Sequence, residues 1–398
     1  MKHKIVEDSS YDNIKKWGDE YSEGDIIQVT SDYLDSHDTT AVEGDFYIAL
    51  GNYQSGADYP ELPGWGENNQ YFKHAWTALS SLKLVLDNGE ASGALYGNGL
   101  NKLAVLAVYT PIDDTGVVVP LPTTVRQSMQ LTLIDYTTGE RLPDGWTTTS
   151  VADEFYSSPV GPQPVRFQHA DDGDFIETLY ISCGRNEPHR RLAIGVQLTL
   201  PNGNVITSSA MSDTQLHSKI DLTALDPITY NSDIISVTSL SQEIPGVGSY
   251  KNYYLFPKDD RFRFIRSNKI SGLRDENKQE GLVSFKFYYA DGVHNEMGFR
   301  FIYYWNVTPE PETRTSLGIY REITAPINAR PGAVNFTRTT QIRTLKANNQ
   351  QDSRECIFEV FDQYGNSGRF KNSKSTGLWQ QDRDGTDPYW YDIQFVDA

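Results

Sequence analysis

The sequence predicts an all-β protein built from two antiparallel β-sandwich domains behind an acidic, irregular N-terminal region. Apolar and polar residues alternate with a period of two in many short stretches, and turn residues separate these stretches roughly every 8–15 residues, a spacing typical of sandwiches. Tyrosine and phenylalanine are abundant, with 24 and 17 copies. Aromatic rings favour strands because they pack well on a pleated surface. Helical periodicity is scarce, and its best candidate, residues 73–82, could equally begin a strand.

Residues 1–75 form the expected acidic extension. Two strand-like runs, 25–34 and 44–51, precede a Gly-, Pro- and Asn-rich stretch over 51–72. Glycine and proline at this density are typical of loops. We therefore predict short strands followed by an ordered aromatic loop.

Residues 76–225 are predicted to form the first sandwich. The run 80–89 ends in an Asp-Asn-Gly turn, and 201–204, "PNGN", separates two strand-like runs. Asn-Gly tolerates the positive φ of a type I′ turn, so this second pattern predicts a hairpin. Further expected strands lie within 100–111, 128–146, 175–184 and 190–210.

Residues 226–398 are predicted to form the second sandwich, of immunoglobulin-like or jelly-roll-like architecture. Its last expected hairpin is 355–370, "ECIFEVFDQYGNSGRF", in which an alternating strand stops at an Asp and restarts after Gly-Asn. The Asp can accept hydrogen bonds from turn amides, and glycine removes the Cβ penalty. The run 129–140, "MQLTLIDYTTGE", shares this pattern. Further expected strands lie within 233–240, 250–257, 261–268, 281–292, 297–312 and 334–345.

The stretch "VFDQYGNSGRF", residues 360–370, resembles the terminal hairpin of bacterial immunoglobulin-like and fibronectin-type sandwich modules. The resemblance covers these few residues, and the chain has no Cys…Trp…Cys spacing of a true immunoglobulin domain. It implies a sandwich fold. Such folds serve adhesion, carbohydrate binding and assembly alike.

The formal net charge is −18 and is unevenly distributed. Residues 1–225 carry 31 acidic and 14 basic side chains, whereas residues 226–398 carry 22 and 21. An acidic surface repels phosphate, so we expect no nucleic-acid partner and no affinity for anionic membranes. A self-repelling surface is the simplest reading of the charge.

The two cysteines, Cys183 and Cys356, are too few for a disulfide framework or a Cys-based zinc site, and we expect buried free thiols. The N-terminus has no apolar core of a secretory signal peptide, and no stretch nears the roughly 18 apolar residues that span a bilayer. We therefore expect synthesis in the cytoplasm without membrane insertion. Release or surface exposure would use a signal-independent route.

Motifs for catalysis or cofactor binding are scarce, and no cofactor is expected apart from calcium. Hard cations take clustered carboxylates, and Asp382, Asp384 and Asp387 surround Gly385. This acidic turn partly resembles an EF-hand loop, but Gln380 and Tyr391 stand where two carboxylate ligands belong. Solvated turn acids are the alternative interpretation.

A glycan hydrolase needs two positioned carboxylates. Asp153, Glu154 and Glu296 are candidates, although nothing in their spacing distinguishes them from other acids. No Gly-x-Ser-x-Gly nucleophile elbow is present.

Aromatic residues in loops are the strongest candidates for ligand contact. Exposed rings offer large contact area at low entropic cost and serve as sugar platforms or protein hot spots. Local packing is the alternative. The predicted partner-binding residues are Tyr59, Trp65, Tyr71, Trp76, Tyr389 and Trp390.

The sequence thus favours a non-enzymatic binding or assembly protein of bacterial type, such as an adhesin, fibre component or toxin accessory module. Its partner would be a protein or a glycan, and self-association into a homo-oligomer is part of the hypothesis. A carbohydrate-binding module or lectin, with Trp65, Trp76 and Trp390 as platforms, is one alternative. A glycan hydrolase with an acidic dyad is the other.

Overall fold

The chain folds into β-sheets, and none of the residues described by the computed structural model is helical. It follows that no described segment could cross a membrane as a helix. The all-β prediction is confirmed. The structure describes residues 14–15, 26–28, 46–49, 72–74, 78–112, 116–118, 129–159, 174–184, 190–199, 204–213, 216–271, 281–289, 297–315, 317, 321–343, 351–352, 355–373 and 393–398.

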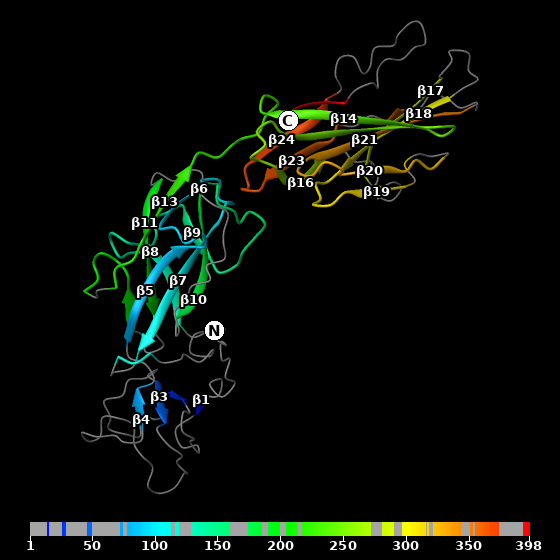
Figure 1. Cartoon of the computed structure of the whole chain (residues 1–398). Helices are drawn as coiled ribbons and strands as arrows, with labels where there is room; N and C mark the ends of the chain where they lie inside the picture. Colours follow the sequence, from blue (N-terminus) through cyan, green and yellow to red (C-terminus); the bar gives the residue numbers. More distant parts are fainter. Residues whose placement is uncertain are drawn as a thin grey trace. The chain divides into compact units, whose positions relative to one another are not determined.

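The chain divides into two compact units (Figure 1). Each unit has its own hydrophobic core. The first comprises Met1–Asp153 and Ser158–Leu225, and the second comprises Glu154–Ser157 and Asp226–Ala398. The three-part division expected from the sequence, with its boundaries after residues 75 and 225, stays a prediction.

The first unit contains two stacked sheets. One is antiparallel, in the order β5-β7-β10-β9. In the other, β11 pairs with β8 along one edge and with β12 and β13 along the opposite edge, and β13 pairs in parallel with β6. The strands are β5 (Ala78–Leu86), β6 (Ser92–Tyr96), β7 (Leu103–Ile112), β8 (Gln130–Asp135), β9 (Trp146–Thr149), β10 (Phe175–Cys183), β11 (Arg191–Thr199), β12 (Val205–Thr207) and β13 (Ile220–Leu225).

The core of the first unit lies between these two sheets and follows the two-residue rhythm of the sequence. On β5, Leu82, Leu84 and Leu86 are buried while Lys83 between them is exposed. Successive side chains of a strand point to opposite faces, so leucines at every second position all enter the core. Residues 78–86 are therefore strand, which decides against the helix considered for residues 73–82.

Four short strands belong to the N-terminal part of the first unit. β1 (Ile14–Lys15) pairs in parallel with β2 (Ile26–Gln28), followed by β3 (Phe46–Ala49) and β4 (Phe72–His74) in antiparallel pairs. Tyr47 on β3 is buried. The two strands expected within 25–34 and 44–51 are present as β2 and β3.

The second unit is built around a six-stranded antiparallel sheet in the order β14-β15-β21-β18-β17-β22. A four-stranded sheet, β16-β23-β24-β25, and a small hairpin, β19-β20, complete it. The strands are β14 (Ile235–Ile244), β15 (Gly248–Pro257), β16 (Phe264–Ser271), β17 (Leu282–Tyr289), β18 (Met297–Trp305), β19 (Glu312–Arg314), β20 (Ala325–Ile327), β21 (Val334–Arg343), β22 (Gln351–Asp352), β23 (Ile357–Asp362), β24 (Ser367–Ser373) and β25 (Gln394–Asp397).

Both faces of the six-stranded sheet are buried over its central strands, β15, β21 and β18. One face sends Tyr253, Tyr304 and Phe336 into a cluster with Phe358 and Phe370 of the four-stranded sheet. Rings of Phe336 and Phe358 lie 5.4 Å apart, a separation typical of favourable aromatic pairs. The other face packs against the segment that carries β19 and β20. Its cluster contains Phe285, Phe299, Phe301, Tyr303, Trp305, Leu317 and Ile323.

A row of buried polar side chains on β21 ties this covering segment to the sheet. Asn335 Oδ1 accepts a hydrogen bond from the Asn328 amide at 3.0 Å. Gln341 Nε2 donates to the Arg321 carbonyl, and Asn252 Nδ2 of β15 donates to the Pro326 carbonyl at 2.5 Å. Because buried polar groups are costly when unpaired, these bonds fix where the covering segment lies.

Four residues between β9 and β10, Glu154–Ser157, belong to the second unit. Phe155 is buried there, with its ring 5.8 Å from that of Phe361. The Arg266 guanidinium lies 4.7 Å and 4.1 Å from these two ring centroids and forms an ion pair with Glu154. A cation stacked on aromatic faces while paired with a carboxylate stabilises this small cluster.

The hairpin predicted at 355–370 is confirmed as β23 and β24, and its turn is organised by Asp362. Asp362 Oδ1 accepts hydrogen bonds from the amides of Tyr364 (2.8 Å) and Asn366 (3.0 Å). Its Oδ2 accepts from the Tyr230 hydroxyl at 2.8 Å and from Asn366 Nδ2 at 3.0 Å. Gly365 has φ 74°, which suits glycine. One carboxylate thus binds both the turn and Tyr230, which precedes the first strand of the six-stranded sheet.

The corresponding turn after β8 is confirmed as well, but its acid is less buried. Asp135 Oδ1 accepts from the amides of Thr137 (2.7 Å) and Thr138 (3.2 Å), and Gly139 has φ 74°. The resemblance of 360–370 to bacterial sandwich modules stays a prediction.

Replacing Asp362 with alanine leaves two turn amides and the Tyr230 hydroxyl without their acceptor inside the protein. We expect Asp362→Ala to lower the free energy of unfolding by about 3 kcal/mol, since each unsatisfied buried donor costs about 1–3 kcal/mol. Asp135→Ala is the matched control, and its more accessible turn should lose about 1 kcal/mol. Urea unfolding followed by tyrosine and tryptophan fluorescence measures both, and equal losses would contradict the role given to Asp362.

A pH dependence follows from the burial of Asp362. Desolvation raises the pKa of this carboxyl above 3.8, although hydrogen bonds from Asn366, Tyr230 and Tyr364 lower it in part. The folded protein therefore keeps this proton to a higher pH than the unfolded chain does. The contribution of the protonated Asp362 to the free energy of unfolding therefore falls as the pH rises from the pKa of this carboxyl in the unfolded chain to its higher pKa in the folded protein. We expect the unfolding free energy of the wild type minus that of Asp362→Asn to decrease from about pH 4 upward. A pH-independent difference would contradict this assignment.

Candidate binding groove

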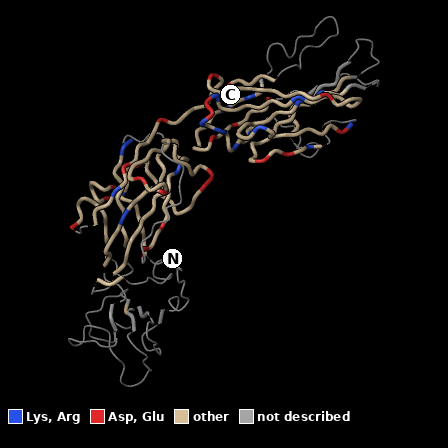
Figure 2. Tube along the Cα trace, in the orientation of Figure 1, with Lys and Arg blue, Asp and Glu red and all other residues tan. Residues whose placement is uncertain are grey.

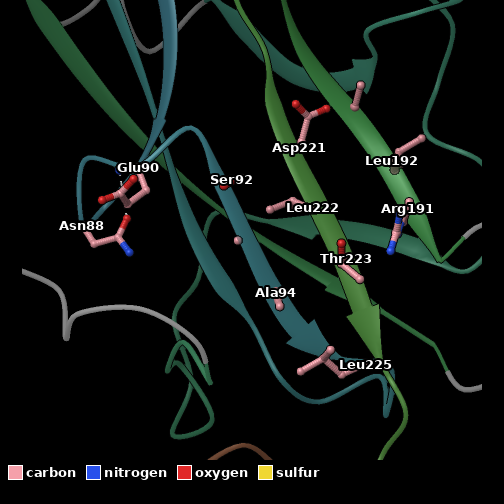
Figure 3. Close-up of a pocket in the computed structure, with 12 residues that line it drawn as sticks. Asn88, Glu90, Ser92, Ala94, Arg191, Leu192, Asp221, Leu222, Thr223 and Leu225 are labelled. Atoms are coloured by element: carbon pink, nitrogen blue, oxygen red, sulfur yellow. Dashed lines mark hydrogen bonds between the residues drawn. The ribbon is translucent and has the colours of Figure 1, made fainter.

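A groove of about 740 Å³ lies on the first unit, over strands β6, β13 and β11 (Figure 3). Its floor is the face of this sheet that points away from the sandwich core. Side chains of Ile194 and Leu95, in the alternate positions of these strands, point into the core instead. The groove is lined by Asn88, Glu90, Ser92, Gly93, Ala94, Arg191, Leu192, Ala193, Asp221, Leu222, Thr223 and Leu225.

Strand register brings small side chains into adjacent positions on this floor. Thr223 of β13 lies opposite Arg191 of β11 and opposite Ala94 of β6. In the next row on the same face, Asp221 lies opposite Ala193 and Ser92. Small residues on neighbouring strands leave the sheet surface low, and longer side chains around them form the walls. The depression follows from this arrangement.

The rim carries both signs of charge. Arg191, Glu90 and Asp221 are exposed lining residues. Lys219 Nζ lies 2.9 Å from Asp221 Oδ2 and holds the aspartate in an exposed ion pair. Exposed pairs contribute little to stability, so these charges are available to contact a ligand at low cost.

One wall is the turn between β5 and β6, where the sequence predicts an Asp-Asn-Gly turn. Gly89 has φ 81°, and its amide donates to the Leu86 carbonyl at 2.8 Å. Asn88 Oδ1 accepts from the Glu90 amide at 3.1 Å. Gly93 follows, and a Cβ there would lie 2.6 Å from Leu86 Cδ1. The turn is therefore fixed by backbone and side-chain bonds, and it presents Asn88 and Glu90 beside the floor (Figure 3).

The binding and metal residues predicted from the sequence lie outside the described residues. Within the described part of the chain, no group of three or more His, Cys, Asp or Glu side chains could hold a metal ion. Calcium binding stays a prediction. The residues concerned are Tyr59, Trp65, Tyr71, Trp76, Tyr389 and Trp390 for binding, and Asp382, Asp384 and Asp387 for calcium.

Two of the acids considered for glycan hydrolysis form ion pairs. Asp153 Oδ2 lies 2.7 Å from Lys102 Nζ, and Glu154 pairs with Arg266. Asp153 belongs to the first unit and Glu154 to the second. Glu296 lies outside the described residues. The proposed dyad therefore stays a prediction, and neither Asp153 nor Glu154 lines the groove.

Both cysteines are buried free thiols, as expected from the sequence. Each is 0% exposed, and burial raises the pKa of Cys356 to about 12. A nucleophilic cysteine needs an accessible thiolate. Their surroundings are apolar cores, where a small sulfur-bearing side chain fills space.

Comparison with known proteins gives no family assignment. No protein-family model matches the chain, and no curated protein matches it in sequence.

Sequence reasoning missed the groove because its residues are unremarkable one by one. Ala94, Ala193 and Thr223 are ordinary strand residues, and only the pairing of β6 with β13 and of β13 with β11 brings them together. The Asp-Asn-Gly turn at one wall is the only signal that the sequence offers.

Burial of both thiols predicts that neither reacts in the folded protein. With a chromogenic disulfide reagent such as dithionitrobenzoate, we expect no reaction in native buffer. Two equivalents per chain should react in guanidinium, because a thiol must be exposed and deprotonated to attack. Fast reaction of either cysteine before unfolding would contradict its placement in the core.

Proposed function

We propose that this chain is a non-enzymatic binding or assembly protein of bacterial type, such as an adhesin, a fibre component or a toxin accessory module. The groove over β6, β13 and β11 would receive an extended segment of a partner protein. The predicted aromatic residues, including Trp65, Trp76 and Trp390, would add contacts from loops.

The observation that carries this proposal is the form of the groove. Its volume of about 740 Å³ falls within the range of ligand sites. Its floor is made of small side chains on paired strands, which are rigid elements. A preformed and rigid surface binds with little loss of conformational freedom, which favours binding.

The chemistry of the lining favours a peptide over a sugar. Ser92, Thr223 and Asn88 offer hydroxyl and amide groups, and Arg191 and Asp221 offer opposite charges. Such groups complement the mixed charges and amides of an extended polypeptide. Glycan sites commonly use a stacked ring, and none of the described residues that line the groove is aromatic. The lectin alternative therefore rests on the loop tryptophans.

Filling the floor tests the proposal. The full chain would be probed with a phage-displayed library of linear peptides and, in parallel, with a glycan array. We expect peptides to be retained and sugars not. Thr223→Trp, which fills the groove, should raise the dissociation constant of the selected peptides by about tenfold or more, and tenfold is equivalent to about 1.4 kcal/mol. Thr132→Trp is the matched control, because Thr132 is an exposed residue of β8 that does not line the groove.

Each other outcome has a defined meaning. Retention of glycans, lost on replacing Trp65 or Trp390, would replace the proposal with the lectin alternative. Cleavage of a bound polysaccharide would favour the hydrolase. Peptides that bind Thr223→Trp as well as the wild type would exclude the groove as their site, and retention of no probe would contradict binding through it.

A further inference from the structure

Strand β14 is a long and open edge of the six-stranded sheet. It pairs with β15 through ten consecutive residue pairs, from Ile235↔Pro257 to Ile244↔Gly248, without a register shift. On its other side no described strand pairs with it. Every residue from Val237 to Glu243 is exposed, and Leu240 is 55% exposed. The outward N–H and C=O groups of such a strand can pair with another strand.

The two other long edge strands among the described residues carry features that block such pairing. β5 has a register shift between Leu79 and Ser81 and an exposed Lys83 in its middle. β16 has two register shifts and carries Arg266 and Lys269. Bulges and lysines are the usual means by which natural sheets prevent edge-to-edge association. Both edges are therefore protected.

β14 has none of these features. Its sequence, ISVTSLSQEI, contains no proline, no basic residue and a single acid, Glu243. The trace of this strand is correspondingly almost free of charge (Figure 2). A ten-residue edge without a bulge or a central charge is open to a further strand.

Symmetry and charge favour a second copy of the same strand as the occupant. In an antiparallel pair of two β14 strands centred on Ser239 or Leu240, Glu243 lies opposite an uncharged residue, Ile235 or Val237. Residues 226–398 carry 22 acids and 21 bases, so two copies of this part do not repel each other through net charge. A self-complementary edge is what a two-fold dimer requires.

We propose that β14 pairs with β14 of a second copy, which joins two six-stranded sheets into one continuous sheet across a two-fold axis. This inference rests on the self-association part of the proposed function, which it deepens, and does not rest on ligand binding in the groove. The groove lies on the first unit, and its ligand binding does not depend on this edge.

Sedimentation of the full chain over about a hundredfold range of concentration tests the dimer, because dimers dissociate on dilution. We expect a monomer–dimer equilibrium. Leu240→Lys places like charges near the two-fold axis, and it should raise the dimer dissociation constant by about tenfold or more. Val151→Lys is the control, since Val151 is 67% exposed and lies outside the strands, and it should leave the constant unchanged.

Cross-linking places the contact. Both native cysteines are fully buried, so an introduced surface cysteine reacts alone. Under mild oxidation, Ser239→Cys alone should form covalent dimers in the register centred on Ser239. A mixture of Ser239→Cys and Ser241→Cys should do so in the register centred on Leu240, because positions 239 and 241 then lie opposite each other. Ser150→Cys, exposed outside β14, should form none. A chain that stays monomeric throughout, or a dimer that neither Leu240→Lys nor the β14 cysteines affect, would overturn the proposal. Peptide retention by Leu240→Lys reports on the groove separately, so the two proposals fail independently.

Discussion

The second unit depends on one constraint, which is that strand β21 must satisfy two buried faces at once. Phe336 and Val334 point into the aromatic core shared with the four-stranded sheet. The alternate residues of the same strand, Asn335 and Thr337, point to the opposite face of the sheet and are also fully buried. Apolar burial stabilises the first face, but on the second each polar group needs a partner. Trp305 Nε1 donates to Thr337 Oγ1 at 2.9 Å, and Thr337 donates to Asn252 Oδ1 at 2.6 Å.

This polar row explains why the covering segment can be mostly irregular and still have a defined place. The short β19–β20 hairpin alone offers three residue pairs of ladder. Its position comes from side chains of the sheet that bond its backbone, at Pro326, Asn328 and Arg321. Apolar residues such as Ile323 and Leu317 then fill the space between. Hydrogen bonds fix the position of the covering segment, and burial of apolar area contributes most of the free energy that stabilises it.

Sequence reasoning predicted the features that are local. Strands, their alternation and the turns at Asp135 and Asp362 are set by residues close together in the chain. The face of β21 that carries Thr337 and Thr339 was not predictable in the same way. In "VNFTRTTQIRTL" alternate polar residues suggest an exposed face, yet these two are buried beneath the segment that carries β19 and β20. The groove was hidden for the same reason, because β6 and β13 pair across more than a hundred residues.

The groove and the β14 edge differ in which part of a sheet is left uncovered. In the first unit, one face of the sheet formed by β11, β13 and β6 is buried in the core. Small side chains on its other face form the floor of the groove, so the surface offered to a ligand consists of side chains. In the second unit both faces of the sheet are buried over its central strands, and the surface proposed to pair with a second copy is the open backbone edge of β14. Side-chain surfaces select ligands by shape and charge, whereas a backbone edge accepts any compatible strand and gains selectivity from symmetry and from the absence of repulsion. A chain that combines both could hold a partner with one unit and a copy of itself with the other, because neither surface uses residues that the other needs.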